Sequence, residues 1–141
     1  MLTGSCLCTV NKYIITNEDA AVLRKVTNPY FRTSIICHCP RCRKIGGGYT
    51  TTNLVMSKTS FKLKSSWKWC SLIPGISKIS TSTFNAVLPD DKHGHICFCR
   101  HCGSVLYREA KMQGWRGLIF VPVGTLDDID SVSDLRKEEW Y

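Results

Sequence analysis

The sequence predicts a mainly β protein held together by metal-binding cysteines. Two observations carry this prediction: short segments rich in β-branched and aromatic residues recur along the chain, and nine cysteines stand in clusters. A chain of 141 residues is close to the commonest domain size. We therefore expect a single domain over residues 1–141.

Strand-like segments follow one another along most of the chain. Gly46–Gly48 and Pro89–Asp91 mark turns between them. Helical signals are confined to Asn17–Lys25 and Ile129–Lys137, which are too short to organise the fold. The predicted strands, in chain order, are Val10–Ile15, Ser34–Ile36, Tyr49–Val55, Phe61–Leu63, Ile76–Thr81, Ser104–Tyr107 and Leu118–Val121.

The composition excludes several classes of protein. With 43% hydrophobic and 21% charged residues, the chain resembles an ordinary globular protein rather than a disordered one. The apolar stretch Leu118–Val123 is far too short to cross a bilayer. No basic segment followed by an apolar one stands near residue 1, so we expect no secretory signal, a cytoplasmic location and no membrane partner.

The formal net charge of +8 raises the question of a nucleic-acid partner. The basic residues are mostly scattered, however, and six of the eleven acidic residues lie within residues 127–139. Cysteines that bind zinc do so as thiolates, so part of the positive charge balances them. We therefore expect a solvated basic surface rather than nucleic-acid binding.

The spacing of the cysteines indicates metal binding. An odd cysteine count without a secretory signal argues against a disulfide framework. Clusters with two or fewer residues between neighbouring cysteines are typical of zinc sites. The cysteines are Cys6 and Cys8, then Cys37, Cys39 and Cys42, a lone Cys70, and Cys97, Cys99 and Cys102.

Two of these clusters can together form a closed site. A tight turn at Cys99 and Cys102 can direct both sulfurs at one ion, and Gly103 can take the left-handed conformation that closes such a turn. In a strand or hairpin edge, Cys6 and Cys8 point to the same face. The pairing stays open on spacing alone, because residues 97–102 repeat the cysteine spacing of residues 37–42.

The remaining triplet supplies only three ligands. Catalytic zinc keeps three protein ligands and one position for water or substrate, whereas structural zinc is closed by a fourth. The triplet is therefore a candidate open site. A fourth ligand would instead make it structural, and the candidates for that ligand are His38, His93, His95, His101 and Cys70.

Four motifs together resemble those of the glutathione-dependent formaldehyde-activating enzyme (Gfa) and centromere protein V family. Their order and spacing cover the chain from residue 4 to about residue 128. The motifs are Gly4-Ser5-Cys6-x-Cys8, Cys37-His38-Cys39-x-x-Cys42-Arg43-Lys44, Phe98-Cys99-x-x-Cys102-Gly103-Ser104-x-Leu106 and Val123-Gly124-Thr125-Leu126-Asp127-Asp128.

The resemblance implies a β-tent fold of twisted antiparallel sheets with two zinc ions per chain. It implies a structural zinc at one cysteine set and a catalytic zinc at the other, and carbon–sulfur lyase chemistry that joins formaldehyde to glutathione. The substrate expected on this basis is a small molecule, with glutathione as a candidate. The implied ligands are Cys6, Cys8, Cys99 and Cys102 for the structural zinc, and Cys37, Cys39 and Cys42 for the catalytic one.

Residues around the triplet are candidates for catalysis and substrate binding. His38 stands between two of its cysteines and is a candidate proton shuttle. Arg41, Arg43, Lys44 and the backbone amide of Gly47 can hold a substrate carboxylate, or they can be ordinary surface groups.

Two alternatives to this function stay open at the level of sequence. One is a lyase, decarboxylase or isomerase that does not use glutathione, and the other is a non-catalytic zinc module that binds a macromolecular partner. The sequence sets no oligomeric state. Cys70 and Cys97 are expected to be buried as small apolar residues rather than to act in catalysis.

Overall fold

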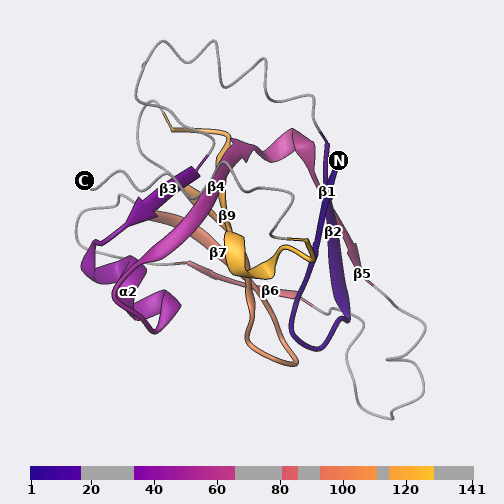
Figure 1. The fold of residues 1–141 in the computed structure, drawn as a ribbon, viewed down its shortest axis with the longest axis horizontal. Helices are drawn as coiled ribbons and strands as arrows, with labels where there is room; N and C mark the ends of the chain where they lie inside the picture. Colours follow the sequence, from indigo (N-terminus) through magenta and orange to yellow (C-terminus); the bar gives the residue numbers. More distant parts are fainter. Residues whose placement is uncertain (17–33, 66–80, 86–92, 111–114, 129–141) are drawn as a thin grey trace.

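The computed structural model describes residues 1–16, 34–65, 81–85, 93–110 and 115–128 (Figure 1). Within them the chain forms two antiparallel sheets with little helix, which confirms the predicted mainly β architecture. The helical signals at 17–25 and 129–137, the turn at 89–91 and most of the strand predicted at 76–81 lie outside the described residues.

The smaller sheet contains three strands in the order β1-β2-β5. It lies beside the N-terminus in Figure 1, with β1 and β2 joined as a hairpin. Gly4 on β1 pairs with Tyr13 on β2, and a Cβ atom at Gly4 would collide with the Tyr13 ring. Gly4 therefore makes room for a buried ring. The three strands are β1 (Leu2–Ser5), β2 (Asn11–Ile15) and β5 (Phe61–Ser65).

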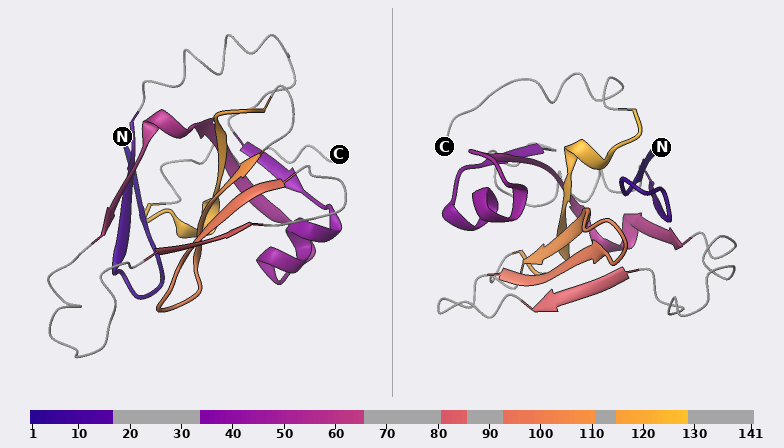
Figure 2. Two further views of the ribbon diagram at one scale, coloured as in Figure 1. Left: turned by 180° about the vertical axis from the view of Figure 1, so that it is seen from behind. Right: turned by 90° about the horizontal axis from the view of Figure 1, so that it is seen from below.

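The larger sheet contains six strands in the order β3-β4-β9-β8-β7-β6, and each neighbouring pair is antiparallel. Two further views show how this sheet curves past the smaller one (Figure 2). The six strands are β3 (Ser34–Cys37), β4 (Thr51–Ser57), β6 (Thr81–Asn85), β7 (His93–Cys99), β8 (Val105–Ala110) and β9 (Leu118–Pro122).

Two short 3₁₀ turns link the sheets. The turn η2 (Lys58–Ser60) carries the chain from β4 in the large sheet directly into β5 in the small one. The turn η3 (Val123–Thr125) follows β9, and Leu126 just beyond it forms an isolated bridge with Gly4. The hydroxyl groups of Tyr13 and Thr125 also share a hydrogen bond of 2.7 Å.

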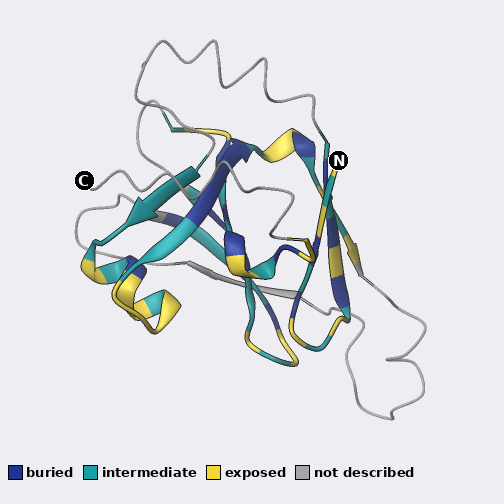
Figure 3. Ribbon diagram, in the orientation of Figure 1, coloured by how far each residue is buried: buried dark blue, intermediate teal, exposed yellow. Residues whose placement is uncertain are grey.

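The hydrophobic core is shared by both sheets. Alternate residues of β4 and β9, including Leu54 and Val121, contribute to it from the large sheet, while Tyr13 and Ile15 contribute from the small one. Stretches of β2 and β4 in this region carry the dark blue of buried residues in Figure 3. Burying one large apolar side chain contributes about 1.5–3 kcal/mol, so this shared core stabilises the packing of sheet on sheet.

The helix α2 (Pro40–Gly46) corrects the expectation that helix would be confined to residues 17–25 and 129–137. Its N-cap is Cys39, whose Sγ accepts a hydrogen bond from the backbone N–H of Cys42 at 3.4 Å. Pro40 occupies the first turn, and Gly47, with φ +67°, ends the helix in the left-handed conformation. With seven residues, the helix is too short to show a helical period in the sequence.

The strand predictions agree with β2, β3, β5 and β9 and overlap β4 and β8. The strand predicted at 76–81 shares only Thr81 with β6, and β1 and β7 were not predicted. In the described part of the chain, no helix has the length and apolar character needed to span a membrane.

Candidate metal centres

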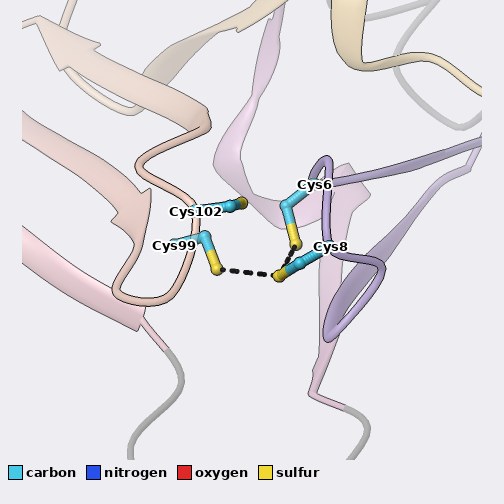
Figure 4. Close-up of side chains that lie close together, drawn as sticks. All are labelled: Cys6, Cys8, Cys99 and Cys102. Atoms are coloured by element: carbon cyan, nitrogen blue, oxygen red, sulfur yellow. Dashed lines mark hydrogen bonds between the residues drawn. The ribbon is translucent and has the colours of Figure 1, made fainter.

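The first cysteine group consists of Cys6, Cys8, Cys99 and Cys102. Cys6 and Cys8 lie in the β1–β2 hairpin loop, and Cys99 and Cys102 lie where β7 turns into β8 (Figure 4). The Sγ atoms of Cys6 and Cys8 are 3.5 Å apart, and those of Cys8 and Cys99 are 3.6 Å apart. All four sulfurs lie within 4.8 Å of one another.

The backbone of each loop fixes the sulfur positions. In the hairpin loop, the N–H of Thr9 donates to the carbonyl of Cys6 at 2.8 Å, and Thr9 itself has a positive φ of 60°. In the second loop, the N–H of Gly103 donates to the carbonyl of Cys99 at 2.9 Å, and Gly103 takes the left-handed φ of 75° that the sequence predicts. Both loops are therefore tight turns that present two sulfurs each.

A direct contact holds the two loops together. The backbone N–H of Leu7 donates to the Oγ of Ser104 at 3.1 Å. Two members of the group, Cys6 and Cys99, are 2% and 0% exposed and belong to the hydrophobic core. The first cysteine group is thus continuous with the packing that stabilises the fold.

The donor set fits a zinc ion. Four sulfurs bound at about 2.3 Å in a tetrahedron lie about 3.8 Å from one another, close to the spacing found here.

The surroundings of the first cysteine group shift the pKa values of two of its thiols in opposite directions. Burial, together with hydrogen bonding among the sulfurs, raises the pKa of Cys8 to about 12. Burial alone would also raise the pKa of Cys102, but hydrogen bonds from Ser104 and Cys8 outweigh it and lower that pKa to about 6.

The second cysteine group consists of Cys37, Cys39 and Cys42. Cys37 ends β3, Cys39 caps α2 and Cys42 lies within that helix. Their three sulfurs also lie within 4.8 Å of one another, and Cys42 is buried while the other two are half-buried. Among the described residues, no histidine or acidic side chain joins this group.

The candidates for a fourth ligand to the second cysteine group divide into two sets. His38, His95 and His101 are described and stand outside the group. Cys70 and the side chain of His93 lie outside the described part of the structure. Among the described residues, the three sulfurs therefore fit a zinc ion with one coordination position that no described side chain fills.

A buried arginine contacts the second cysteine group. Nη1 of Arg108, on β8, donates to the Sγ of Cys42 at 2.9 Å, and Nη2 donates to Oδ1 of Asn53 at 2.6 Å. Burial alone would raise the pKa of Cys42, but a hydrogen bond from Cys37 and the charge and hydrogen bond of Arg108 outweigh it and lower that pKa. Burial and hydrogen bonding to Cys42 raise the pKa of Cys37 to about 12.

Three of the predicted substrate-binding residues line one cavity beside α2. Its volume is about 400 Å³, within the range of small-molecule sites. Arg41 does not line this cavity and is half-buried. The lining residues are Pro40, Arg43, Lys44, Gly47, Gly48 and Tyr49.

A second cavity of about 350 Å³ reaches from one cysteine group towards the other. It is bounded by Cys102 of the first group and by Arg108, which contacts Cys42 of the second. Its polar lining includes Thr51, Asn53, Ser104 and Thr125.

Sequence reasoning missed Arg108 altogether. The residue directly follows the predicted strand Ser104–Tyr107, and its partners Cys42 and Asn53 are 66 and 55 residues away in the chain. A single cationic residue after a predicted strand does not indicate a buried contact, because most such residues are solvated.

Cys97 is 3% exposed and lies in the core, as expected from the sequence.

The fold and the two cysteine groups define a class: mainly β proteins with one four-sulfur and one three-sulfur group that can hold metal ions. The chain belongs to the glutathione-dependent formaldehyde-activating enzyme family, whose sequence model matches residues 1–141. No curated protein matches the chain.

The fold also matches a solved structure. The crystal structure of a Rhodobacter sphaeroides protein, a structural genomics target, is similar to this chain with a TM-score of 0.61 and 15% sequence identity. The match covers 99% of this chain and 100% of the other. At this level of identity the likeness concerns the fold.

Proposed function

We propose that this protein is a zinc-dependent enzyme of the carbon–sulfur lyase type that acts on a glutathione adduct or a similar small carbonyl metabolite. The observation that carries the proposal is the contrast in ligand number between the cysteine groups. Four sulfurs close the first group, whereas three sulfurs in the second leave room for a substrate atom. We assign a structural zinc to the first group and a catalytic zinc to the second.

The reaction proposed is the addition of a thiol to formaldehyde. A bond forms between the glutathione sulfur and the carbonyl carbon, the carbonyl π bond breaks, and the thiol proton ends on the resulting hydroxyl oxygen. Zinc at the second group supplies a Lewis acid that binds a thiolate or polarises a carbonyl oxygen. His38 lies between two ligand cysteines and is the proposed carrier of the proton.

The cavity beside α2 supports binding of the carboxylates of glutathione. Arg43 and Lys44 are exposed cations on its wall, and they also lie in the last turn of α2. The backbone at Gly47 turns in the left-handed conformation on the same wall. These groups can hold two anionic ends of a small peptide by charge-assisted hydrogen bonds.

The test combines zinc analysis with an assay. We expect the purified protein to contain two zinc ions per chain and to form S-hydroxymethylglutathione faster than the uncatalysed reaction, measured by NMR exchange between free and bound formaldehyde. Cys39→Ser is expected to lose one zinc and the rate enhancement, whereas Cys97→Ala, outside both groups, keeps both. A protein with two zinc ions and no rate enhancement would exclude glutathione addition as its reaction.

A further inference from the structure

Arg108 is a charged side chain inside the protein. It is only 8% exposed, whereas burying an arginine is costly unless an anion or several acceptors compensate for the lost water. In the described part of the chain no carboxylate partners it; its contacts are Cys42, Asn53 and a weak one to Thr51. Its Nε is buried without an acceptor, so the surrounding groups do not satisfy every hydrogen-bond donor of this arginine.

The strand register places Arg108 on the same sheet face as the second cysteine group. Residues directly opposite each other on neighbouring strands point to the same face, as do residues two apart on one strand. Cys37 pairs with Thr51, and Asn53 pairs with Pro122. Arg108 pairs with Phe120, two residues from Pro122, so its side chain extends over β9 to reach β4.

A chain of hydrogen bonds anchors the guanidinium to the sheet. Asn53, which is 1% exposed, accepts from Nη2 of Arg108 and donates through Nδ2 to both the carbonyl and the Oγ1 of Thr51, each at 3.1 Å. Thr51 is in turn the strand partner of Cys37. Arg108 therefore ties Cys42, on the helix, to the strand pair that carries Cys37.

The charge of Arg108 is complementary to that of the second cysteine group with a bound divalent ion. Three thiolates around a divalent ion carry a net charge of −1, which is unfavourable beside a buried surface. The guanidinium of Arg108 carries a positive charge and lies at hydrogen-bond distance from one of those sulfurs. Each charge thus compensates for the burial of the other.

We propose that Arg108 is a positioning residue of the second cysteine group: it holds the Cys42 sulfur in place and balances the negative charge of the metal-bound triplet. This inference rests on the metal binding of the proposed function and is independent of the substrate. The effect expected is on the affinity and geometry of the metal, since partners of metal ligands typically change affinity by 10–100-fold.

The test uses cobalt(II) in place of zinc, because its visible and sulfur charge-transfer bands report affinity and geometry at each group. Cys39→Ser assigns the bands of the second group by their loss. Arg108→Met keeps the length of the side chain without its charge. We expect it to bind cobalt at the second group about 10–100-fold more weakly, with shifted bands, while the bands of the first group stay unchanged.

Matched variants separate this role from a structural one. Arg116→Met removes an exposed arginine and is expected to leave both sets of bands unchanged. Arg108→Lys keeps the charge and is expected to stay within about threefold of the native affinity, whereas Arg108→Gln resembles the Met variant. Loss of the bands of the first group would show that Arg108→Met fails to fold. In that case the proposal is tested by comparing the cobalt affinity of Arg108→Lys with that of Arg108→Gln.

The outcomes distinguish the two proposals. Equal cobalt affinity and identical bands in native protein, Arg108→Met and Arg108→Gln would overturn the role of Arg108 while leaving the metal site intact. Cobalt binding at only one group in the native protein would overturn the three-sulfur metal site itself, and with it this inference.

Discussion

The two cysteine groups differ in how they are joined to the rest of the protein. The first group lies between two tight loops, and Cys6 and Cys99 are part of the hydrophobic core. The second group lies at the junction of β3 and α2, and two of its three cysteines are half-buried. Its contact with the interior is polar and runs through Arg108 and Asn53.

This difference explains why the same ligand chemistry can serve two purposes. A group that is closed by four sulfurs and packed in the core can contribute to folding but cannot accept a substrate. A group with three sulfurs, two of them on half-buried residues, and with a cation beside the third can accept one. Removing a ligand should therefore affect stability at the first group and activity at the second.

The largest effect is expected for Cys99→Ser. Structural zinc binding is worth an apparent ~10–16 kcal/mol in small zinc-finger peptides, which is comparable to the whole stability of a domain. We expect this variant to lose the zinc of the first group and the cooperative thermal unfolding transition, measured by circular dichroism and elemental analysis. A native-like transition in Cys99→Ser would remove the distinction between the groups.

The next effect is expected for Cys39→Ser, on activity rather than on stability. Serine is a favourable N-cap residue, so its hydroxyl can replace the sulfur that accepts from the N–H of Cys42 and keep α2 in place. We expect loss of one zinc and at least a hundredfold loss of activity, with unfolding still cooperative. Unfolding as complete as in Cys99→Ser would contradict the comparison.

Alanine substitutions at two left-handed glycines should have intermediate effects. Gly103 and Gly47 have φ of +75° and +67°, where alanine is strained by roughly 1–2 kcal/mol. Gly103→Ala should lower stability and speed zinc release from the first group, measured with a chromophoric chelator, whereas Gly47→Ala should leave that release unchanged. Gly124, with a negative φ and open space around it, provides the control.

The smallest effect is expected from charge removal on the wall of the cavity beside α2. Arg43→Gln and Lys44→Gln remove exposed cations, whose ion pairs are worth about 0.2–1 kcal/mol each. Steady-state kinetics should show KM for an anionic thiol raised about two- to fivefold with kcat unchanged. An equal change in Arg116→Gln, or a fall in kcat alone, would place the substrate elsewhere.

The sequence was a better guide to the two cysteine groups than to the strands and helix that carry them. Cysteine spacing is local, so the clusters and the turn at Gly103 could be predicted from it. The pairing of the clusters came from the resemblance to a known family, and the structure brings the same two groups together. Neither β1 nor β7 was predicted, since β1 has four residues and β7 reads His-Gly-His-Ile-Cys-Phe-Cys, in which glycine and two cysteines interrupt the usual strand pattern.

The contacts of Arg108 could not be predicted for a different reason. They depend on the register of β4, β8 and β9, which brings residues more than 50 positions apart to one sheet face. No local pattern contains that register. The helix α2 was missed because seven residues show no helical period and because its cap is a cysteine rather than a residue typical of helix N-termini.

The span of the first cysteine group has a consequence for how the protein is made. Cys8 and Cys99, whose sulfurs lie 3.6 Å apart, are separated by 91 residues in the sequence. At about 5–20 residues per second, a ribosome takes roughly 5–20 s to advance from one to the other. Throughout that interval the β1–β2 hairpin presents only two of the four sulfurs, so the first cysteine group cannot be complete before the β7–β8 turn has been synthesised.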